Sequence, residues 1–178
     1  MTLPALPPAR LSDGVVDLRL VEARDWMLDQ AMSQDAEIVR WTPMPPSLSE
    51  QQAHERVHQA IGQHATNNRA IWVIERDGER QGRAGLFARP DGAVELFYAL
   101  LGKARGAGTA TRAARLLTNW AVKAGADRVV LTTFPENTAS QHTARRAGFR
   151  PVGRERRAIK GTERELLLWS WAATTESQ

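Results

Sequence analysis

The sequence predicts a single α+β domain built around a mixed β-sheet. Its 178 residues match the size of one domain, and no internal repeat or linker-like stretch divides them. Stretches with the two-residue alternation of strands and stretches with the helical period occur in both halves of the chain. Hydrophobic residues make up 42% of the chain and charged residues 25%, so the domain can bury a core.

The first half is predicted to contain one strand, two helices and a three-stranded meander. Three prolines between residues 41 and 47 exclude a helix or a central strand, so this stretch is predicted to be a loop. The expected elements are a strand at 15–21, a short helix at 25–32, a helix that Ser49 caps, and strands at 70–75, 81–87 and 94–101.

The second half is predicted to alternate helices and strands and to end in a hairpin. Ala113, Leu117 and Ala121 recur at helical spacing, so the first of these helices is amphipathic and packs on the sheet. The expected elements are a helix at about 107–123, a strand at 128–133, a helix at 137–147, and strands at roughly 149–157 and 163–171.

Short segments at both ends of the chain are expected to lie outside the domain. We expect a flexible, proline-rich N-terminus at residues 1–12, one domain at 13–172 and a C-terminal tail at 173–178. The first residues lack the basic and apolar segments of a signal sequence, and no stretch approaches the roughly 20 apolar residues that span a bilayer. The absence of cysteine excludes disulfides and thiolate nucleophiles. We therefore expect a cytoplasmic protein with no membrane partner.

The formal net charge is +4, and much of the excess lies between Arg145 and Lys160. A nucleic-acid surface is one interpretation of these arginines. No zinc-finger spacing, stacking motif or RNP-like segment accompanies them, so a solvated face or a site for a phosphorylated cofactor is favoured over nucleic acid.

A glycine-rich turn at 105–110 follows a predicted strand and opens a predicted helix. Unpaired backbone N–H groups and the helix dipole converge at such a turn, and Gly106 and Gly108 let a ligand approach the backbone. A phosphate or pyrophosphate site is therefore one interpretation, and a purely steric helix start is the other. The dinucleotide fingerprint is not met, because position 111 is threonine.

A second pattern begins at Asn137. This residue is a good N-cap, and Gly148 is a good C-cap, so both are also explained by helix structure alone. Capping does not explain Ser140, a hydroxyl one turn inside the helix and near the end of the preceding strand.

Together these motifs resemble those of the GNAT N-acetyltransferases, specifically the RimJ/RimL branch. Arg105-Gly-Ala-Gly-Thr-Ala110 is similar to the family's Q/R-x-x-G-x-G/A motif, and Asn137-Thr-Ala-Ser140 with Ala147-Gly148-Phe149 is similar to its second motif. Arg40-Trp41-Thr-Pro-Met-Pro and Trp72-Val-Ile-Glu-Arg-Asp-Gly also resemble that branch. The resemblance covers roughly residues 12–172.

This resemblance implies a GNAT fold, in which about four helices flank a mixed, splayed sheet of six to seven strands. It implies acetyl-CoA as donor, with the pyrophosphate on the glycine turn, the pantetheine arm along the strand that ends near residue 101, and the thioester pointing toward Ser140. The implied donor-binding residues are Leu100, Leu101, Arg105, Gly106, Ala107, Gly108, Thr109, Ala110 and Asn137.

Transfer of the acetyl group to an amine needs a neutral amine, a stabilised oxyanion and a proton for the leaving thiolate. Ser140 is the candidate for the thiolate contact, acting by orientation and hydrogen bonding. Glu95 is the candidate general base, and an ion pair with an arginine is the alternative. Many GNAT enzymes have a tyrosine acid seven residues after the motif asparagine, and here that position is Ala144. The branch often has an acidic residue in the helix after the glycine turn, and here it is Arg112.

The acceptor is an amine that the sequence does not identify. Trp41 and Tyr98 are the candidate acceptor-binding residues. His54 and His58 are four residues apart on a predicted helix, but no carboxylate follows them in a metal-binding pattern, so we expect no metal. A protein N-terminal α-amine is the first choice, and a small-molecule or antibiotic amine is the alternative. An acidic pocket would favour a polycationic drug and an open groove a peptide. A CoA-binding or nucleic-acid-binding module without catalysis is the rival class, and a homodimer remains open.

Overall fold

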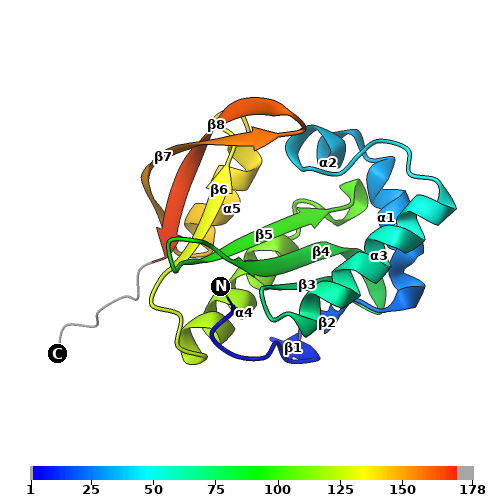
Figure 1. The fold of residues 1–178 in the computed structure, drawn as a ribbon, viewed down its shortest axis with the longest axis horizontal. Helices are drawn as coiled ribbons and strands as arrows, with labels where there is room; N and C mark the ends of the chain where they lie inside the picture. The colour runs from blue at the N-terminus through cyan, green and yellow to red at the C-terminus, as the bar shows by residue number, and fades with distance from the viewer. Residues whose placement is uncertain (1, 172–178) are drawn as a thin grey trace.

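The computed structural model describes residues 2–171, which form one α+β unit around an eight-stranded sheet (Figure 1). The strand order is β1-β2-β3-β4-β5-β6-β8-β7. The elements are β1 (Arg10–Ser12), β2 (Asp17–Leu20), the 3-10 turn η1 (Ala23–Asp25), α1 (Trp26–Ser33), α2 (Ala36–Trp41), α3 (Glu50–Ala65), β3 (Arg69–Arg76), β4 (Glu79–Ala88), β5 (Val94–Leu100), η2 (Gly102–Ala104), α4 (Thr109–Lys123), β6 (Val129–Thr133), α5 (Thr138–Arg146), β7 (Phe149–Ile159) and β8 (Thr162–Trp171).

The sheet opens between β5 and β6, as the resemblance implied. All other neighbouring strands are antiparallel, whereas these two are parallel and pair only at Val94 with Val129 and at Glu95 with Val130. Beyond those pairs β5 follows β4 and β6 follows β8, so the two strands diverge in Figure 1. The sheet thus has a first part, β1–β5, and a second part, β6–β8, with a gap between them.

Helices cover both faces of the first part of the sheet. Alternate residues of β3, β4 and β5 pack with α4 in one core cluster, which includes Trp72, Leu96 and Leu117. The other residues pack with α1 and α3 in a second cluster, which includes Val57 and Ile71. The predicted amphipathic stripe of α4 and the predicted cap of α3 by Ser49 are both confirmed.

The structure has one more strand and one more helix than the expected upper counts. Helix α2 was not predicted, and it places Trp41 at the end of a helix instead of in the loop. Asp35 caps α2 by accepting the backbone N–H groups of Glu37 and Ile38. Strand β1 lies within the segment that was expected to be a flexible terminus, and it pairs with β2.

The N-terminal segment is attached to the sheet before β1 begins. Leu3 is buried and its N–H donates to the carbonyl of Asn67, while the indole of Trp72 donates to the carbonyl of Pro8. We expected a flexible N-terminus at 1–12, but residues 3–12 are held against the sheet. The predicted tail at 173–178 lies outside the described residues.

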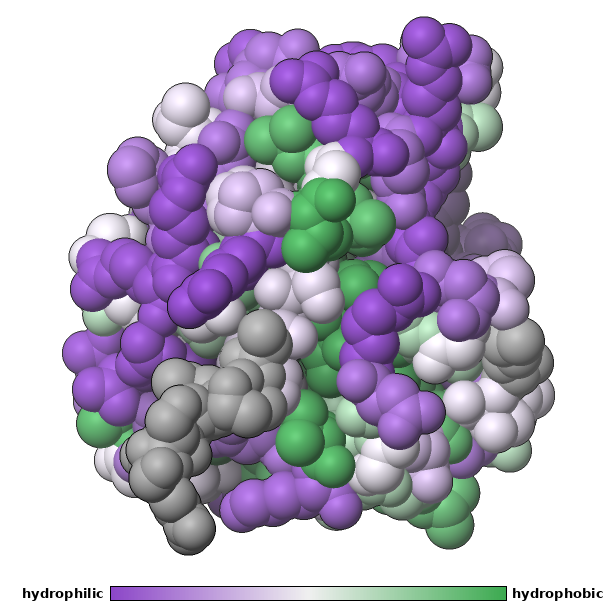
Figure 2. Space-filling model, turned by 90° about the vertical axis from the view of Figure 1, so that its left-hand side faces the viewer, coloured by the Kyte–Doolittle hydropathy of each residue, from purple (hydrophilic) through white to green (hydrophobic). Residues whose placement is uncertain are grey.

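Strand β7 forms one end of the sheet and pairs only with β8. The pairing shifts register between Pro151 and Gly153, which is typical of a β-bulge. Figure 2 shows the side of the molecule on which this hairpin lies, where hydrophilic side chains cover most of the surface. Among the described residues, no helix is long and apolar enough to cross a membrane.

Candidate active site

A cavity of about 630 Å³ runs through the gap between β5 and β6. Its walls come from the glycine turn, α4 and α5 on one side of the sheet and from α1, α2, α3 and the β7–β8 hairpin on the other. Most of the predicted site residues line it: Trp41, Glu95, Tyr98, Leu100, Arg105, Gly106, Gly108, Thr109, Ala110, Asn137 and Ser140. Leu101 and Ala107 were predicted with them but do not line the cavity.

The glycine turn presents unused hydrogen-bond donors to the cavity. Gly106 and Gly108 have φ values of +84° and +76°, and Gly108 is the N-cap of α4. The backbone N–H groups of residues 106–111 have no acceptor among residues 2–171. A Cβ atom on either glycine would meet nothing within 4 Å, so the space in front of the turn is open. This arrangement fits an anion such as a pyrophosphate.

Two arginines fix the shape of the turn. Arg76 donates to the carbonyl oxygen of Ala107 at 3.0 Å. Arg105 donates to the carbonyl oxygen of Leu100 at 3.1 Å and to Asp35 at 2.6 Å, so it links the turn to α2. Burial alone would raise the pKa of Asp35, but the hydrogen bonds from Arg105 and from backbone N–H groups outweigh it and lower that pKa.

The edge of β5 facing the gap also has backbone groups that the sheet does not use. The N–H of Val94 points toward β6 and the N–H of Leu101 donates to Gln81 on the β4 side. Because successive residues of a strand point their backbone groups to opposite sides, Leu96, Tyr98 and Leu100 point theirs away from β4. The pairing of Glu95 with Val130 uses the N–H of Leu96, so the N–H groups of Tyr98 and Leu100 face the gap. Leu100 therefore points its N–H to the gap, whereas the N–H of Leu101 is already paired with Gln81.

Tyr98 and Ser140 meet in the cavity. The two hydroxyl oxygens lie 3.0 Å apart, and the Tyr98 hydroxyl also donates to the carbonyl oxygen of Ser140 at 3.1 Å. Burial raises the pKa of Tyr98, although hydrogen bonds with Ser140 and Thr143 oppose that effect. Asn137 caps α5, as predicted, by accepting the N–H of Ser140 at 3.0 Å, and this fixes the serine.

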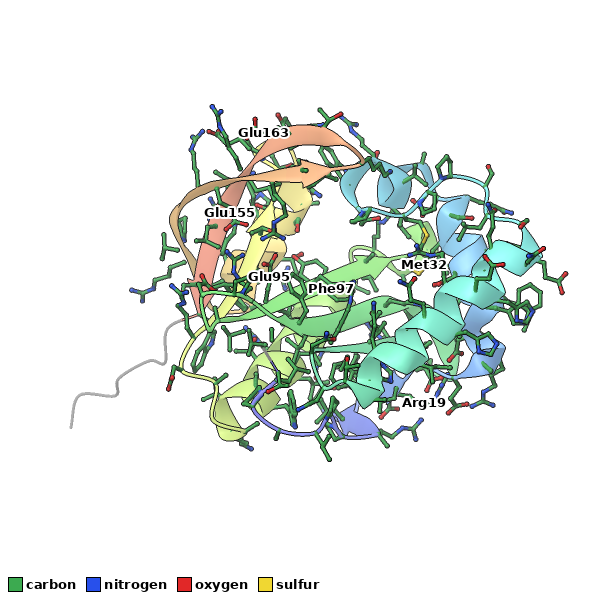
Figure 3. All side chains as sticks on the ribbon, in the orientation of Figure 1. Arg19, Met32, Glu95, Phe97, Glu155 and Glu163 are labelled. Atoms are coloured by element: carbon green, nitrogen blue, oxygen red, sulfur yellow. The ribbon has the colours of Figure 1, made fainter. Side chains whose placement is uncertain are left out.

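Glu95 is buried where β5 and β6 begin to diverge, and its two oxygens accept four hydrogen bonds. Oε1 accepts from Thr132 at 3.0 Å and from Arg157 at 2.9 Å. Oε2 accepts from Arg157 at 2.8 Å and from Arg89 at 2.6 Å. Arg89 and Arg157 also bind Glu155, which lies near Glu95 in Figure 3. We call these five residues the Glu95 cluster.

The Glu95 cluster differs from the environment that a general base needs. A carboxylate oxygen has about two lone-pair directions for acceptance, and both oxygens already use two. The structure therefore favours the ion-pair alternative for Glu95 over the predicted role as base.

Two aromatic rings lie at the rim of the cavity on the side that α2 lines. The ring of Trp41 lies 5.5 Å from that of Phe134, and its indole donates to Glu37 at 2.7 Å. Lys160, in the turn of the β7–β8 hairpin, donates to the carbonyl oxygen of Val39 on α2. The hairpin and α2 therefore meet across this end of the cavity (Figure 1).

The family described as "Acetyltransferase (GNAT) domain" matches residues 16–150. The chain belongs to this family. It is an acetyl-CoA-dependent N-acetyltransferase. The unused N–H groups of the glycine turn and the open edge of β5 fit such a donor. In the described part of the chain, no three His, Asp or Glu side chains converge in a way that could hold a metal ion.

The structure is also similar to solved GNAT acetyltransferases. The microcin C7 self-immunity acetyltransferase MccE, in complex with acetyl-CoA and AMP, has a TM-score of 0.83 at 16% identity over 94% of this chain and 98% of MccE. RimL, the ribosomal L7/L12 α-N-protein acetyltransferase, in complex with CoA, has a TM-score of 0.79 at 20% identity over 92% and 95%. Mycobacterium smegmatis RimJ has a TM-score of 0.79 at 24% identity over 100% and 93%.

Sequence reasoning missed part of this acetyltransferase site. It assigned Tyr98 to acceptor binding, whereas the structure pairs its hydroxyl with Ser140. It did not identify Arg89 or Arg157 as a partner of Glu95. Arg157 is 62 positions away in the chain, and Arg89, although only six positions away, lies across the turn between β4 and β5. The only signal was the excess of arginine between residues 145 and 160.

Proposed function

We propose that this enzyme transfers the acetyl group of acetyl-CoA to the N-terminal α-amine of a protein. The observation that carries the proposal is the continuous cavity from the glycine turn, through the gap in the sheet, to the rim at Trp41. A donor on one side and an amine on the other can meet in such a passage. The similarity to RimL, whose substrate is a protein α-amine, supports this choice of acceptor.

The donor is held mainly by backbone groups in this proposal. The N–H groups of residues 106–111 bind the pyrophosphate, because they are unused and lie at the positive end of the α4 dipole. The backbone groups of Tyr98 and Leu100 bind the amides of the pantetheine arm from the open edge of β5. The donor itself supplies an activated acyl carbon. Arg105 holds the turn against α2 and does not need to contact the donor.

Ser140 and Tyr98 act together at the leaving sulfur. The Ser140 hydroxyl donates toward the sulfur. For this the Tyr98 hydroxyl turns its single proton from the carbonyl oxygen of Ser140 to the hydroxyl oxygen of Ser140, 3.0 Å away. The pair thereby replaces the tyrosine that many family members have at the position of Ala144. Glu95 fixes Arg157 and Thr132 beside the gap and does not take the amine proton. That proton passes through water to the leaving thiolate, which departs as free coenzyme A.

The donor site is tested with two matched glycine substitutions at opposite ends of α4. Gly108 and Gly125 both have positive φ and open space around them, and Asp tolerates that conformation better than most residues. Gly108→Asp places a negative charge where the pyrophosphate binds, whereas Gly125→Asp causes the same backbone strain far from it. We expect acetyl-CoA affinity, measured by calorimetry, to fall more than about a hundredfold in Gly108→Asp only.

The acceptor is tested by mass spectrometry of peptides with free and blocked α-amines. Acetylation confined to free α-amines supports the proposal. Acetylation of small amines but of no peptide would replace it with the small-molecule alternative. Loss of acetyl-CoA affinity in both glycine variants would contradict the assignment of the pyrophosphate site to the glycine turn.

A further inference from the structure

Three arginines line the acceptor side of the cavity and have no part in the proposed transfer. Arg56 comes from α3, Arg69 from the start of β3 and Arg83 from β4. We call them the arginine pocket. The carboxylate of Asp29 lies 2.7 Å from Arg83 and 3.7 Å from Arg56. This carboxylate therefore lies beside two of the three guanidinium groups.

Arg69 has no counter-charge. Within residues 2–171 no carboxylate lies at ion-pair distance from it. Its Nε atom is buried and has no hydrogen-bond partner there, and the same is true of the Nε atom of Arg56. Burial, and then the charge of Arg56, lower the pKa of Arg69. A half-buried cation in this state gains most from an anion that enters the cavity.

Two aromatic rings hold the Arg69 guanidinium in place. It lies 5.1 Å from the ring centre of Phe97 and 5.8 Å from that of Phe87. The ring of Phe97 takes this position because Gly85 lies beneath it, where a Cβ atom would come within 2.4 Å of the ring. The guanidinium is thus positioned before any ligand binds, which reduces the entropy cost of binding.

The arginine pocket lies within reach of the gap in the sheet. Arg69 is opposite Phe87, and Phe87 is opposite Glu95, so all three point to one face of the sheet. Adjacent strands are about 4.8 Å apart, so Arg69 is about 10 Å from Glu95. Figure 3 shows Glu95 and Phe97 near each other on β5.

We propose that the arginine pocket binds an anionic group of the acceptor, so that the preferred acceptors are amines with a carboxylate or phosphate far enough from the nitrogen to span the roughly 10 Å between the pocket and the gap. The inference rests on the proposed function and narrows its substrate class. In a peptide, the group is an acidic side chain at the second or third residue, because an extended chain rises about 3.3 Å per residue. The same charge disfavours polycationic antibiotics.

The test compares two peptides and four enzymes. The peptides have the same length and a serine N-terminus, with Glu at positions two and three in one and Gln in the other. The enzymes are the wild type, Arg69→Gln and Arg69→Lys, with Arg24→Gln as control because Arg24 is 64% exposed and does not line the cavity. Acetyl-CoA binding verifies that each variant is folded.

We expect the wild type to prefer the acidic peptide by about tenfold to a hundredfold in kcat/KM, through KM. Arg69→Gln abolishes this preference, Arg69→Lys keeps part of it, and Arg24→Gln keeps all of it. If the wild type acetylates both peptides equally, the inference is wrong and the proposed function stands. If Arg69→Gln keeps the full preference, the arginine pocket is not its source.

A second pair of acceptors separates the two sources of the anion. An ω-aminoalkyl phosphate is compared with the corresponding amino alcohol. If the phosphate compound is acetylated and no peptide is, the arginine pocket stands and the protein acceptor falls. If acetyl-CoA binds and neither the peptides nor these amines are acetylated, both proposals are wrong.

Discussion

At the scale of single residues, the proposed mechanism gives the pair Tyr98–Ser140 the role that a tyrosine on a different element has in many family members. Family members with the usual acid have it on α5, where this chain has Ala144. Here the phenol comes from β5 and reaches the same cavity, 3.0 Å from the Ser140 hydroxyl. Burial keeps the pKa of Tyr98 above its ordinary value, so the phenol stays protonated and able to donate in neutral and moderately alkaline solution.

Tyr98→Phe tests this pair. The substitution removes one hydroxyl and leaves the ring, so we expect kcat to fall about tenfold to a hundredfold while acetyl-CoA affinity stays unchanged. Because the wild-type phenol does not ionise between about pH 7 and pH 9, the ratio of the two kcat values should be constant over that range. Steady-state kinetics at several pH values measure it. An unchanged kcat would mean that Ser140 acts without Tyr98.

At the scale of elements, Asp25 attaches the start of α1 to the sheet. It is fully buried, accepts two hydrogen bonds from Arg19 on β2 at 3.1 and 3.0 Å, and accepts the N–H of Glu22 at 2.8 Å. Burial alone would raise the pKa of Asp25, but Arg19 and that N–H outweigh it and lower the pKa. The ionised carboxylate therefore stabilises the folded state.

Asp25→Asn is expected to lower the free energy of unfolding by about 3 kcal/mol at pH 7, because it leaves Arg19 without one of its partners. A carboxyl whose pKa is lower in the folded state stabilises the fold above its unfolded pKa, and this contribution is lost as pH falls through the folded value. The difference between wild type and variant should therefore be constant from about pH 5 to pH 8 and shrink below about pH 4. Urea unfolding at each pH measures it. A difference that grew in acid would contradict the assignment.

Elements with several turns or alternations were predictable, and short ones were not. The stripe of α4 and the caps at Ser49 and Asn137 are local patterns, and the structure confirms them. Helix α2 has six residues and β1 has three, too few for a period to emerge. The partners of Glu95 could not be predicted, because contacts between distant segments leave no local signature in one sequence.

At the scale of the whole molecule, the Glu95 cluster joins the two parts of the sheet. Parallel pairing between β5 and β6 covers only two residues of each strand. Just there, Glu95 on β5 binds Thr132 on β6 and Arg157 on β7. These contacts reinforce the end of the gap, and the remainder of the gap stays open for ligands.

Glu95→Gln distinguishes this role from that of a general base. Loss of a buried charge that binds two arginines should cost about 3 kcal/mol and lower Tm by about 6–12 °C. Turnover well below Tm should fall less than about tenfold, whereas removal of a general base costs about 10²–10⁴-fold. Thermal unfolding and initial rates of the same preparation give both numbers. A large loss of kcat with an unchanged Tm would show that Glu95 acts as the general base.

The end strand β7 has a consequence for self-association. An end strand offers a row of backbone donors and acceptors to any other extended chain, and strand-by-strand addition begins at such edges. Pro151 lacks a donor, and the register shift beside it interrupts the row. Arg150, Arg154 and Arg156 are exposed along the same strand, so a second copy would bring like charges together. These three arginines therefore disfavour pairing of β7 with the same strand of another copy.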